Sequence, residues 1–598
     1  MRLTGGQILA HYLIREGVPY AVGIPGHGCW AIVDAFADFT DRLTTIQVMH
    51  EQSAVHLADG YYRVTGRPLL AFTSIGPGAT NTAVGIATAY VDSTAVLLVT
   101  GSPHTYMRGR SVLQEIERTQ WANFPRMMEP IVKRYWQPSR VDQLPYVLQR
   151  AFNQMLGGRP GPVLIDMPMD VQADDAEVTL PEPALHEPVG RPRPDADSVE
   201  RAARMLVEAR RPVLLVGGGV ITAGAPGELV ALAEHLGAPV VTTWMGKGAI
   251  PEDHELNAWS VGDTASTCGN ALARTADVLL AVGCRFTDWS ASSYRRDISF
   301  SIPPTHLIHV DIDPHEIGKN YPCEIGLVGD ARAALVDLRE AVRQATPARD
   351  YHESSYFQEV QRLKQEWDEM QSPRRNSDAV PITQSRAVRE LRAALDRSAI
   401  VVTGAGLVQG VVRQDFPVYE PRTHLTSGGF STMGFTVPAA IGAKLAAPER
   451  QVTGIAGDGD FLQTMQEMAV AAMLDLPVLF VVLNNAGWMS IKGGQLSNFG
   501  RVFATEFQRR DGSTYTPDLA ACARSFGLHS ERVERPDEVA AAVKRALATD
   551  GPALVEVTVA REFPDAGATK TGWWDVPVPT YHREQRRRYE AERAEEQV

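Results

Sequence analysis

The sequence predicts an α/β protein built from three doubly wound domains with mainly parallel sheets. Short apolar runs that end in polar or glycine-rich loops alternate with helical stretches along most of the chain. This alternation is typical of parallel strands joined by crossover helices. With 598 residues the chain is also too long for one hydrophobic core, so roughly three or four domains are expected.

Changes in composition indicate where these domains begin and end. The Pro-rich stretch 180–197 has few apolar runs and favours an extended linker. The charged stretch 346–380 carries both signs, which favours an exposed helical connector. The predicted parts are a first domain (1–179), the linker (180–197), a central domain (198–345), the connector (346–380), a third domain (381–565) and a C-terminal tail (566–598).

Composition argues against several classes of function. The net charge of −13 disfavours nucleic acid or an anionic membrane as the principal partner, and no apolar run reaches transmembrane length. The start, MRLTGGQILAHYL, lacks the charged-then-apolar order of a signal peptide. Five cysteines are scattered without metal-binding spacing, so we expect a cytoplasmic protein with reduced thiols.

The first domain is expected to contain strands at 20–24, 46–49, 69–73 and 95–100. Each strand ends in a polar or glycine-rich loop, and these loops should share the carboxyl edge of one sheet. Glu51 follows the second strand and opens a helix. A carboxylate at a helix start is usually a surface residue stabilised by the helix dipole, so its position alone does not make it catalytic.

The central domain is expected to contain strands at 211–216, 278–282 and 307–310. The first of them runs into Gly217-Gly218-Gly219. Alone, this glycine run is a weak signal for dinucleotide binding.

In the third domain two apolar runs, Val452 to Ala456 and Val478 to Leu483, flank a helical pattern. This arrangement predicts two parallel strands joined by a helix. The loops that follow the strands, Gly457-Asp458-Gly459 and Asn484-Asn485, are separated by 24 residues. They should therefore lie at the same edge of the sheet, where open α/β sheets bind ligands.

These two loops have the chemistry of a metal–diphosphate site. Asp458 offers a carboxylate oxygen and Asn485 an amide oxygen, and Mg²⁺ prefers oxygen ligands. Gly457 and Gly459 let the backbone approach a phosphate closely. An ordinary glycine-rich turn is the alternative for Gly-Asp-Gly alone, and the spacing to Asn-Asn argues against it.

Three stretches of the chain resemble one enzyme family. Gly-Asp-Gly followed at this distance by Asn-Asn resembles the thiamine-diphosphate motif. HEQSAVHLADGYYRVTGRP, followed by SIGPGATN, resembles the pyrimidine-binding domain of the acetolactate synthase family of thiamine-diphosphate enzymes. SGGFSTMGFTVPAAIGA, residues 427–443, is similar to that family's SGGLGTMGFGLPAAIGA. The resemblance spans almost the whole chain and implies pyrimidine-binding, central and diphosphate-binding domains in this order.

The resemblance also implies roles for individual residues. Glu51 matches the acid that bonds N1′ of the cofactor's aminopyrimidine and favours the tautomer that deprotonates thiazolium C2. Met433 matches a wedge between the cofactor rings, with a core methionine as the alternative. The carbonyl of Ser431 matches the acceptor for the 4′-amine. The implied contacts of thiamine diphosphate are Gly406, Ser431, Met433, Gly457, Asp458, Gly459, Asn485 and Gly487, of which Asp458, Asn485 and Gly487 also bind Mg²⁺.

The pocket departs from acetolactate synthase at two places. Trp289 stands where the synthase has the Arg that anchors the second ketoacid, and an indole cannot pair with a carboxylate. Gly494 falls where the synthase has a Trp that selects 2-ketobutyrate. The pocket should be wider there, with Trp488 and Lys492 as candidates for its wall.

Two further residues of the first domain are candidates for catalysis. Gln114 matches a substrate-side glutamine of the family, although Leu113 replaces the neighbouring Phe; a surface amide is the alternative. His27 lies in a Gly-His loop that the cyclic-diketone hydrolases of the family share. It is a candidate acid or base beside the intermediate, and a bystander histidine is the alternative.

Whether the central domain holds a flavin is left open by the resemblance. In acetolactate synthase this domain holds FAD in a non-redox role, and in many relatives it is empty or holds another nucleotide. The family's FAD-contacting Gly-Met-His-Gly stretch reads Val261-Gly262-Asp263-Thr264 here.

The resemblance implies an enzyme that forms or cleaves C–C bonds. The first interpretation is a carboligase or lyase of acetolactate synthase type that forms an acyl-anion (enamine) intermediate from a 2-ketoacid or diketone. The alternative is a C–C hydrolase of a cyclic or polyhydroxylated diketone. It is favoured by His27, Trp289 and the Trp573-Trp574 tail, which resembles that of the trihydroxycyclohexanedione hydrolases. A structural flap is the other interpretation of this tail.

A non-catalytic regulatory member of the family is a third alternative, against which the intact Glu51, Asp458, Asn485 and Met433 argue. The resemblance finally implies a homodimer or homotetramer with the active site between subunits.

Overall fold

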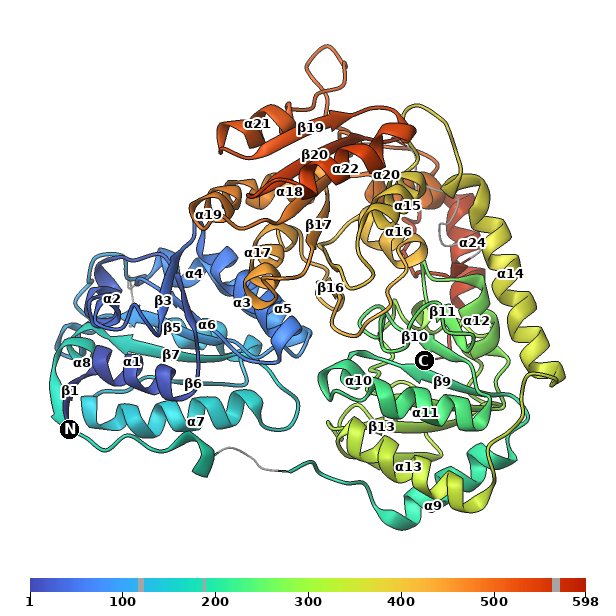
Figure 1. Ribbon diagram of the computed structural model, residues 1–598, viewed down its shortest axis with the longest axis horizontal. Helices are drawn as coiled ribbons and strands as arrows, with labels where there is room; N and C mark the ends of the chain where they lie inside the picture. Colours follow the sequence, from blue (N-terminus) through green and yellow to red (C-terminus); the bar gives the residue numbers. More distant parts are fainter. Residues whose placement is uncertain (117–122, 187–189, 562–570, 598) are drawn as a thin grey trace.

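The computed structural model describes residues 1–116, 123–186, 190–561 and 571–597. In Figure 1 the first domain (blue to cyan) lies at the left, the central domain (green) at the lower right, and the third domain (gold to red) across the top. Within the described residues each domain contains one six-stranded sheet whose pairings are all parallel. The predicted fold class is therefore confirmed.

The strand orders define the three sheets. The first sheet runs β3 (Thr44–Gln47), β2 (Tyr20–Gly23), β4 (Leu70–Thr73), β5 (Leu97–Ser102), β7 (Val163–Pro168) and β6 (Arg134–Trp136). The central sheet runs β11 (Asn257–Ser260), β10 (Val240–Thr242), β9 (Pro212–Val216), β12 (Val278–Val282), β13 (His306–Asp311) and β14 (Ile325–Val328). The third runs β16 (His424–Thr426), β15 (Ile400–Thr403), β17 (Val452–Gly457), β18 (Leu479–Asn484), β20 (Ala553–Thr558) and β19 (His529–Val533).

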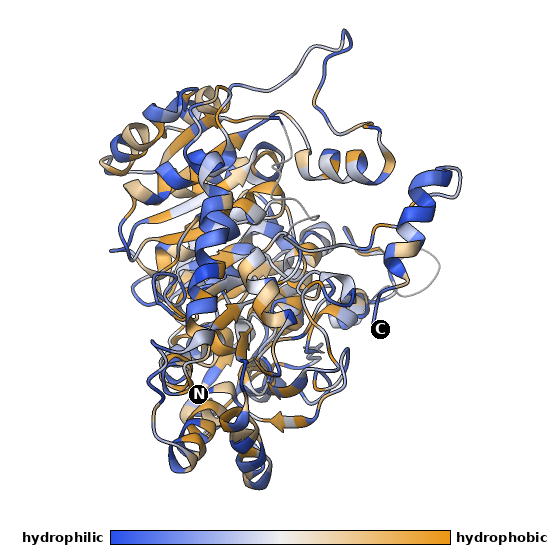
Figure 2. Ribbon diagram, turned by 90° about the vertical axis from the view of Figure 1, so that its right-hand side faces the viewer, coloured by the Kyte–Doolittle hydropathy of each residue, from blue (hydrophilic) through white to orange (hydrophobic). Residues whose placement is uncertain are grey.

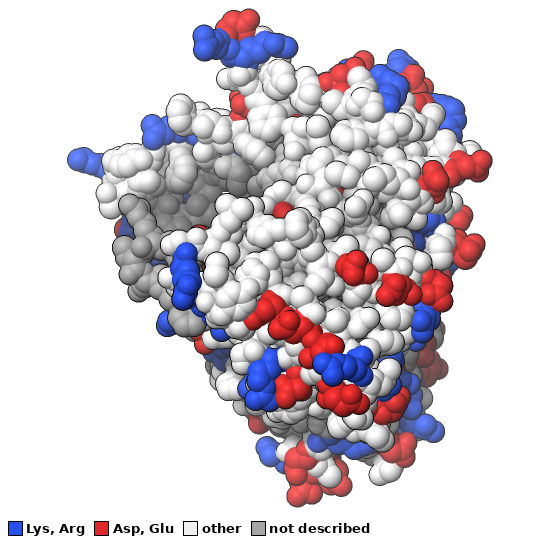
Figure 3. All heavy atoms as spheres, turned by 90° about the vertical axis from the view of Figure 1, so that its left-hand side faces the viewer, with Lys and Arg blue, Asp and Glu red and all other residues white. Residues whose placement is uncertain are grey.

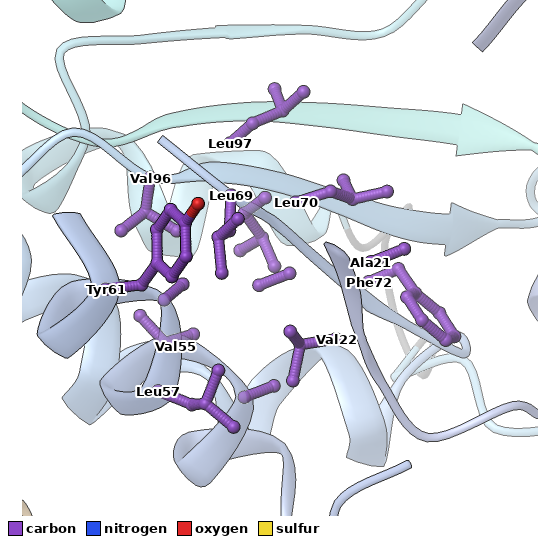
Figure 4. Close-up of a cluster of buried hydrophobic side chains, with 14 of the residues drawn as sticks. Ala21, Val22, Val55, Leu57, Tyr61, Leu69, Leu70, Phe72, Val96 and Leu97 are labelled. Atoms are coloured by element: carbon purple, nitrogen blue, oxygen red, sulfur yellow. The ribbon is translucent and has the colours of Figure 1, made fainter. Parts of the chain in front are cut away.

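The central strands are buried on both faces, because helices cover the two sides of each sheet. Every residue of β4, β5 and β7 is buried, as expected for parallel strands in a doubly wound domain. Figure 4 shows the core of the first domain, where Val22 of β2 lies near Val55 and Leu57 of α3 (Glu51–Thr65).

The first and third domains share one hydrophobic cluster. Helix α3 packs so closely on α17 (Thr436–Ala446) that a Cβ at Gly60 would lie 2.2 Å from the carbonyl oxygen of Ala439. This contact fixes the start of α3, and with it Glu51, relative to the third domain.

The predicted strand–helix–strand unit of the third domain is present, with a difference in its helix. Strands β17 and β18 are parallel neighbours, but the helix between them is broken into α18 (Asp458–Thr464), a 3₁₀ turn (Met465–Glu467) and α19 (Met468–Met473). At the break, the Thr464 hydroxyl donates to the carbonyl of Gly434. The Asp460 side chain accepts the N–H of Gly434. Hydrogen bonds to a residue far away in the chain therefore accompany the break in the helix.

The charged connector contains a 21-residue helix, α14 (Ser355–Arg375). The sequence predicts that this connector is exposed. The prediction is wrong for one face of the helix, because Trp367 is fully buried in a hydrophobic cluster of the central domain. The mixed charges lie on the remaining surface, so α14 is part of the central domain's packing. Among the described residues, no helix has the length and apolar character needed to cross a membrane.

The C-terminal tail returns to the central domain. Helix α24 (Arg583–Arg593) is strongly hydrophilic and stands off the main body near the C-terminus (Figure 2). After it, Glu595 pairs with Arg295. Before it, the N–H of Asp575 donates to the Ser293 hydroxyl at 2.9 Å. The tail also contacts α20 (Met489–Phe499), where Arg588 donates to the carbonyl of Ser497.

Candidate functional site

The loop that follows β4 brings the candidate residues of the first domain together. Its Ser74 hydroxyl accepts the N–H of Gly28 at 3.2 Å, next to His27. Its Gly76 has a φ of 60°, and a Cβ there would lie 1.8 Å from the carbonyl oxygen of Gln114. The same loop passes Glu51, so one turn after a buried strand gathers the three candidates on one edge of the sheet.

Glu51 is the first residue of α3 and has Asn81 and Gly78 as neighbours. The Asn81 side chain donates to Oε2 of Glu51 at 2.9 Å, and a Cβ at Gly78 would lie 3.0 Å from Oε1. The carboxylate is partly exposed. Its orientation is therefore set by the protein, while solvent or a ligand can still reach it.

His27 lies in a short 3₁₀ turn, His27–Cys29, after β2. Its ring meets Trp30 edge to face, with 6.5 Å between centroids. The Nε2 atom is buried and has no hydrogen-bond partner within the described part of the chain. An unpaired ring nitrogen at this edge is available to a bound molecule.

Asp458 begins α18 directly after β17 and is 2% exposed. Its two carboxylate oxygens accept the N–H groups of Gly459 and Gly487, each at 3.1 Å. Burial raises the pKa of Asp458 to about 6, and these hydrogen bonds oppose the rise. A buried carboxylate of this kind is stabilised by a cation.

Asn484 and Asn485, at the end of β18, differ in their bonding. The Asn484 side chain donates to Glu556 at 2.7 Å and to Thr516 at 2.8 Å, so it has a structural role. The Asn485 Oδ1 is buried and has no partner among the residues described here. Buried acceptors are rarely left unpaired, and this oxygen next to the Asp458 loop fits a metal ligand.

The two glycines that flank Asp458 face different surroundings. Of the residues that the structure describes, a Cβ at Gly457 would meet only Val408, at 3.7 Å. A Cβ at Gly459 would lie 2.0 Å from the ring of Trp488, which also meets Phe507 edge to face. Trp488 therefore covers the Gly-Asp-Gly turn, while Gly457 is the glycine with free space beside it.

The loop before α17 contains Ser431 and Met433. Ser431 has a left-handed φ of 53°, and its N–H donates to the carbonyl of Ser427 at 2.6 Å. Met433 is 36% exposed, which is not the burial of a core methionine. Gly406 precedes α16 (Leu407–Asp415) with a φ of 130°, a value that only glycine adopts readily.

Trp289 and Lys492 already have partners in this chain. The Trp289 ring meets Trp244 and Trp574 edge to face, with centroids 5.6 and 4.9 Å apart. Lys492 pairs with Glu506 at 3.0 Å. None of the described residues lies within 4 Å of a Cβ at Gly494, so these residues leave open space where the family's Trp would stand.

Sequence reasoning missed Glu467 and Asn81. Glu467 is 1% exposed and accepts the N–H of Met49 at 3.1 Å, close to the start of α3. Burial raises its pKa to about 7. The sequence signal for Glu467 was an acidic residue inside a helical pattern of apolar residues. For Asn81 the signal was its position in the Ser74–Asn81 loop.

Comparison with known proteins gives a consistent result. Three family descriptions match: "Thiamine pyrophosphate enzyme, N-terminal TPP binding domain" over 3–121, the central domain over 199–338, and the C-terminal TPP binding domain over 404–557. The chain is 36% identical to a probable acetolactate synthase large subunit of Methanocaldococcus jannaschii, covering 93% of this chain and 92% of the relative.

Two bacterial proteins give a similar picture. Identity to the acetolactate synthase large subunit of Corynebacterium glutamicum is 34%, covering 94% of this chain and 87% of that protein. Identity to the isozyme 1 large subunit of Escherichia coli is 33%, covering 94% and 95%.

Proposed function

The chain belongs to the thiamine-diphosphate enzymes of the acetolactate synthase family, and on that premise we propose that it is a carboligase of acetolactate synthase type. It joins a unit derived from a 2-ketoacid to a second carbonyl compound. The observation that carries the proposal is the unpaired Asn485 Oδ1 beside the buried Asp458 carboxylate, which together supply two oxygen ligands for a diphosphate-bound cation.

Residues of the third domain bind the cofactor's charged end. Asp458, Asn485 and the backbone of Gly487 would hold Mg²⁺, and the open space at Gly457 would admit the diphosphate. Within the described residues no cluster of three His, Cys, Asp or Glu side chains could hold a metal alone. Mg²⁺ usually keeps phosphate and water ligands, so the cofactor's phosphate oxygens would complete its coordination.

Residues around the cofactor's rings control one proton. Thiamine diphosphate supplies a nucleophilic carbon when it is bound. Glu51, oriented by Asn81, would hold the proton at N1′ of the aminopyrimidine. Met433 would separate the two rings, and the Ser431 carbonyl would accept from the 4′-amine. His27 and Gln114 would lie on the side of the reacting carbonyl compound.

A C–C hydrolase of a cyclic diketone is the second candidate, because Trp289 provides no charge for a second ketoacid's carboxylate. The test is incubation with 2-ketoacids and cyclic diketones in the presence of thiamine diphosphate and Mg²⁺, with products identified by mass spectrometry. The carboligase proposal expects CO₂ release and a ligated hydroxyketone product from a 2-ketoacid. Ring opening of a diketone without ligation would instead support the hydrolase.

The partner that completes the site is a second copy of this chain. Figure 3 shows that the upper part of the face turned to the viewer has few charged groups. Separately, Met433 and Phe430 are 36% and 45% exposed, and Leu113 is 75% exposed. We propose that Glu51 of one copy acts on the cofactor held by Asp458 of the other, in a dimer or tetramer.

The five cysteines, all described, form no disulfide, which supports a reducing, cytoplasmic setting.

Subunit complementation tests this arrangement. Glu51→Gln and Asp458→Asn chains are each expected to be inactive. Co-expressed, they should regain part of the activity, because one of the two shared sites then has both native residues. No recovery in verified mixed dimers would place both residues of a site in one chain.

A further inference from the structure

The loop 427–433 of the third domain carries two candidate cofactor contacts, Ser431 and Met433, on either side of a buried residue. Ser431 and Met433 are exposed, whereas Thr432 between them is buried. The three residues share one turn of the backbone. The group that holds the Thr432 side chain therefore determines where its two neighbours point.

The partner of Thr432 is Thr88, which lies in the first domain on α5 (Ala83–Val91). The two hydroxyl oxygens are 2.7 Å apart, and Thr88 is fully buried. The Thr88 hydroxyl donates its single proton to the carbonyl of Val84 at 2.9 Å, so its oxygen accepts the proton of the Thr432 hydroxyl. A hydrogen bond between domains thus anchors the loop at its buried residue.

Asp92 anchors the same loop nearer to its start. It directly follows α5, one helical turn after Thr88, and its side chain has no exposed area. Its Oδ1 accepts the N–H of Gly429 at 2.7 Å, a hydrogen bond strengthened by the charge of the acceptor. A Cβ at Gly429 would lie 2.5 Å from this oxygen, so the glycine is what allows the carboxylate to approach the loop backbone.

Arg63, in the last turn of α3, connects Asp92 to the strand that precedes the loop. Its Nη2 donates to Oδ2 of Asp92 at 3.0 Å, and its Nη1 donates to the carbonyl of Thr426 at 2.5 Å. Arg63 also pairs with Asp59, one turn earlier in α3. A buried network whose members are all paired favours one geometry over others, so α3 and α5 together hold the loop in one place.

The third domain supplies the shape of the loop. The Ser427 hydroxyl accepts the N–H of Thr432 at 3.0 Å and donates to the carbonyl of the same residue at 3.1 Å. These two bonds close the loop on itself. The contacts of Thr88 and Asp92 then place this closed loop relative to the first domain.

We propose that Thr88 and Asp92 are positioning residues of the active site. They hold the loop 427–433 so that the Ser431 carbonyl and the Met433 side chain face the rings of thiamine diphosphate. The inference rests on the proposed function, which assigns Ser431 and Met433 to the cofactor. Thr88 and Asp92 act on the cofactor through this loop.

The first test uses the full chain without cofactor and follows amide hydrogen exchange of residues 427–433 by mass spectrometry. Thr88→Val leaves the Thr432 hydroxyl buried without its acceptor, and Asp92→Ala removes the acceptor of the Gly429 N–H. Loss of one such bond should speed exchange of the loop about tenfold. Thr88→Ser keeps the hydroxyl and should retain the protection of the unchanged protein.

Thr305→Val is the matched control for this test. It also removes a buried hydroxyl, one that donates to the carbonyl of Ala276 within the central domain, and it should leave exchange of the loop unchanged. Thermal unfolding of each variant verifies folding. Thr88→Val changes one hydroxyl to a methyl group and decides the test if Asp92→Ala does not fold. Unchanged protection of the loop in Thr88→Val would overturn the proposal.

The second test uses the full chain saturated with thiamine diphosphate and Mg²⁺. A misplaced loop should slow exchange of the cofactor's C2 proton, measured by NMR, about tenfold or more in Thr88→Val. Thr88→Ser should restore the rate, and Thr305→Val should match the unchanged protein. A wild-type rate in Thr88→Val would show that Thr88 has a structural role alone. If calorimetry showed no binding of thiamine diphosphate to the unchanged protein, the proposed function would fail and this inference with it.

Discussion

The Asn81 side chain holds one oxygen of Glu51 at 2.9 Å, and Gly78 leaves room for the other. Glu51→Gln preserves this shape but removes the carboxylate, so we expect an intact fold and about 10²–10⁴-fold slower proton removal from the cofactor. The rate of this proton removal can be measured by NMR as the exchange rate of the C2 proton of bound thiamine diphosphate. Asn81→Ala, which only loosens the carboxylate, should slow exchange less. Unchanged exchange in Glu51→Gln would remove Glu51 from this role.

The two adjacent asparagines provide a second matched pair. Asn485→Ala removes an oxygen without a protein partner, so stability should be nearly unchanged while the affinity for Mg²⁺ and thiamine diphosphate falls. Asn484→Ala removes three hydrogen bonds, including one to the buried Glu556, and should cost about 1–3 kcal/mol of stability. Thermal unfolding and calorimetry separate the two effects. The reverse pattern would mean that Asn484 is the ligand.

Gly457 and Gly459 should respond differently to an added methyl group. Gly459→Ala drives a Cβ into the Trp488 ring, and we expect a loss of about 1–3 kcal/mol from overpacking. Gly457→Ala meets no close atom, so its apo stability should hold while cofactor affinity drops. Wild-type affinity in a folded Gly457→Ala protein would show that no phosphate approaches there.

Glu467 should make stability depend on pH. Its pKa is raised from 4.5 to about 7 in the native state, a difference of about 3 kcal/mol. As the pH rises from about 4.5 to 7, the unfolded chain loses this proton while the native chain retains it, so stability falls and then levels off.

Glu467→Gln mimics the protonated acid and keeps an oxygen for the Met49 N–H. The variant should match the wild type near pH 4.5 and become increasingly more stable than it up to pH 7, as measured by the apparent Tm. A stability difference that does not vary with pH would indicate that Glu467 titrates normally.

The sequence predicted those features that depend on local pattern. Runs such as Val278 to Val282 became strands with the same limits, because apolar stretches bounded by loops need no distant partner to be identified. The break after Thr464 was not predictable, since it depends on bonds to Gly434. The buried face of α14 was not predicted, because the helix is strongly charged on average and its burial depends largely on one residue, Trp367.

The same distinction applies to the site. Motif spacing located Asp458 and Asn485, whereas the surroundings of Trp289 arise from residues far apart in the chain, Trp244 and Trp574. The sequence showed that Trp289 cannot bind a carboxylate, but only the structure shows which side chains pack around its ring.

The route of the C-terminal tail has a consequence for how the domains hold together. The tail joins α20, which begins beside Trp488 at the Gly-Asp-Gly turn, to the central domain, through the contacts of Arg588 with Ser497 and of Trp574 with Trp289. Separating the third domain from the central domain would break these contacts, so the tail acts as a strap between the two.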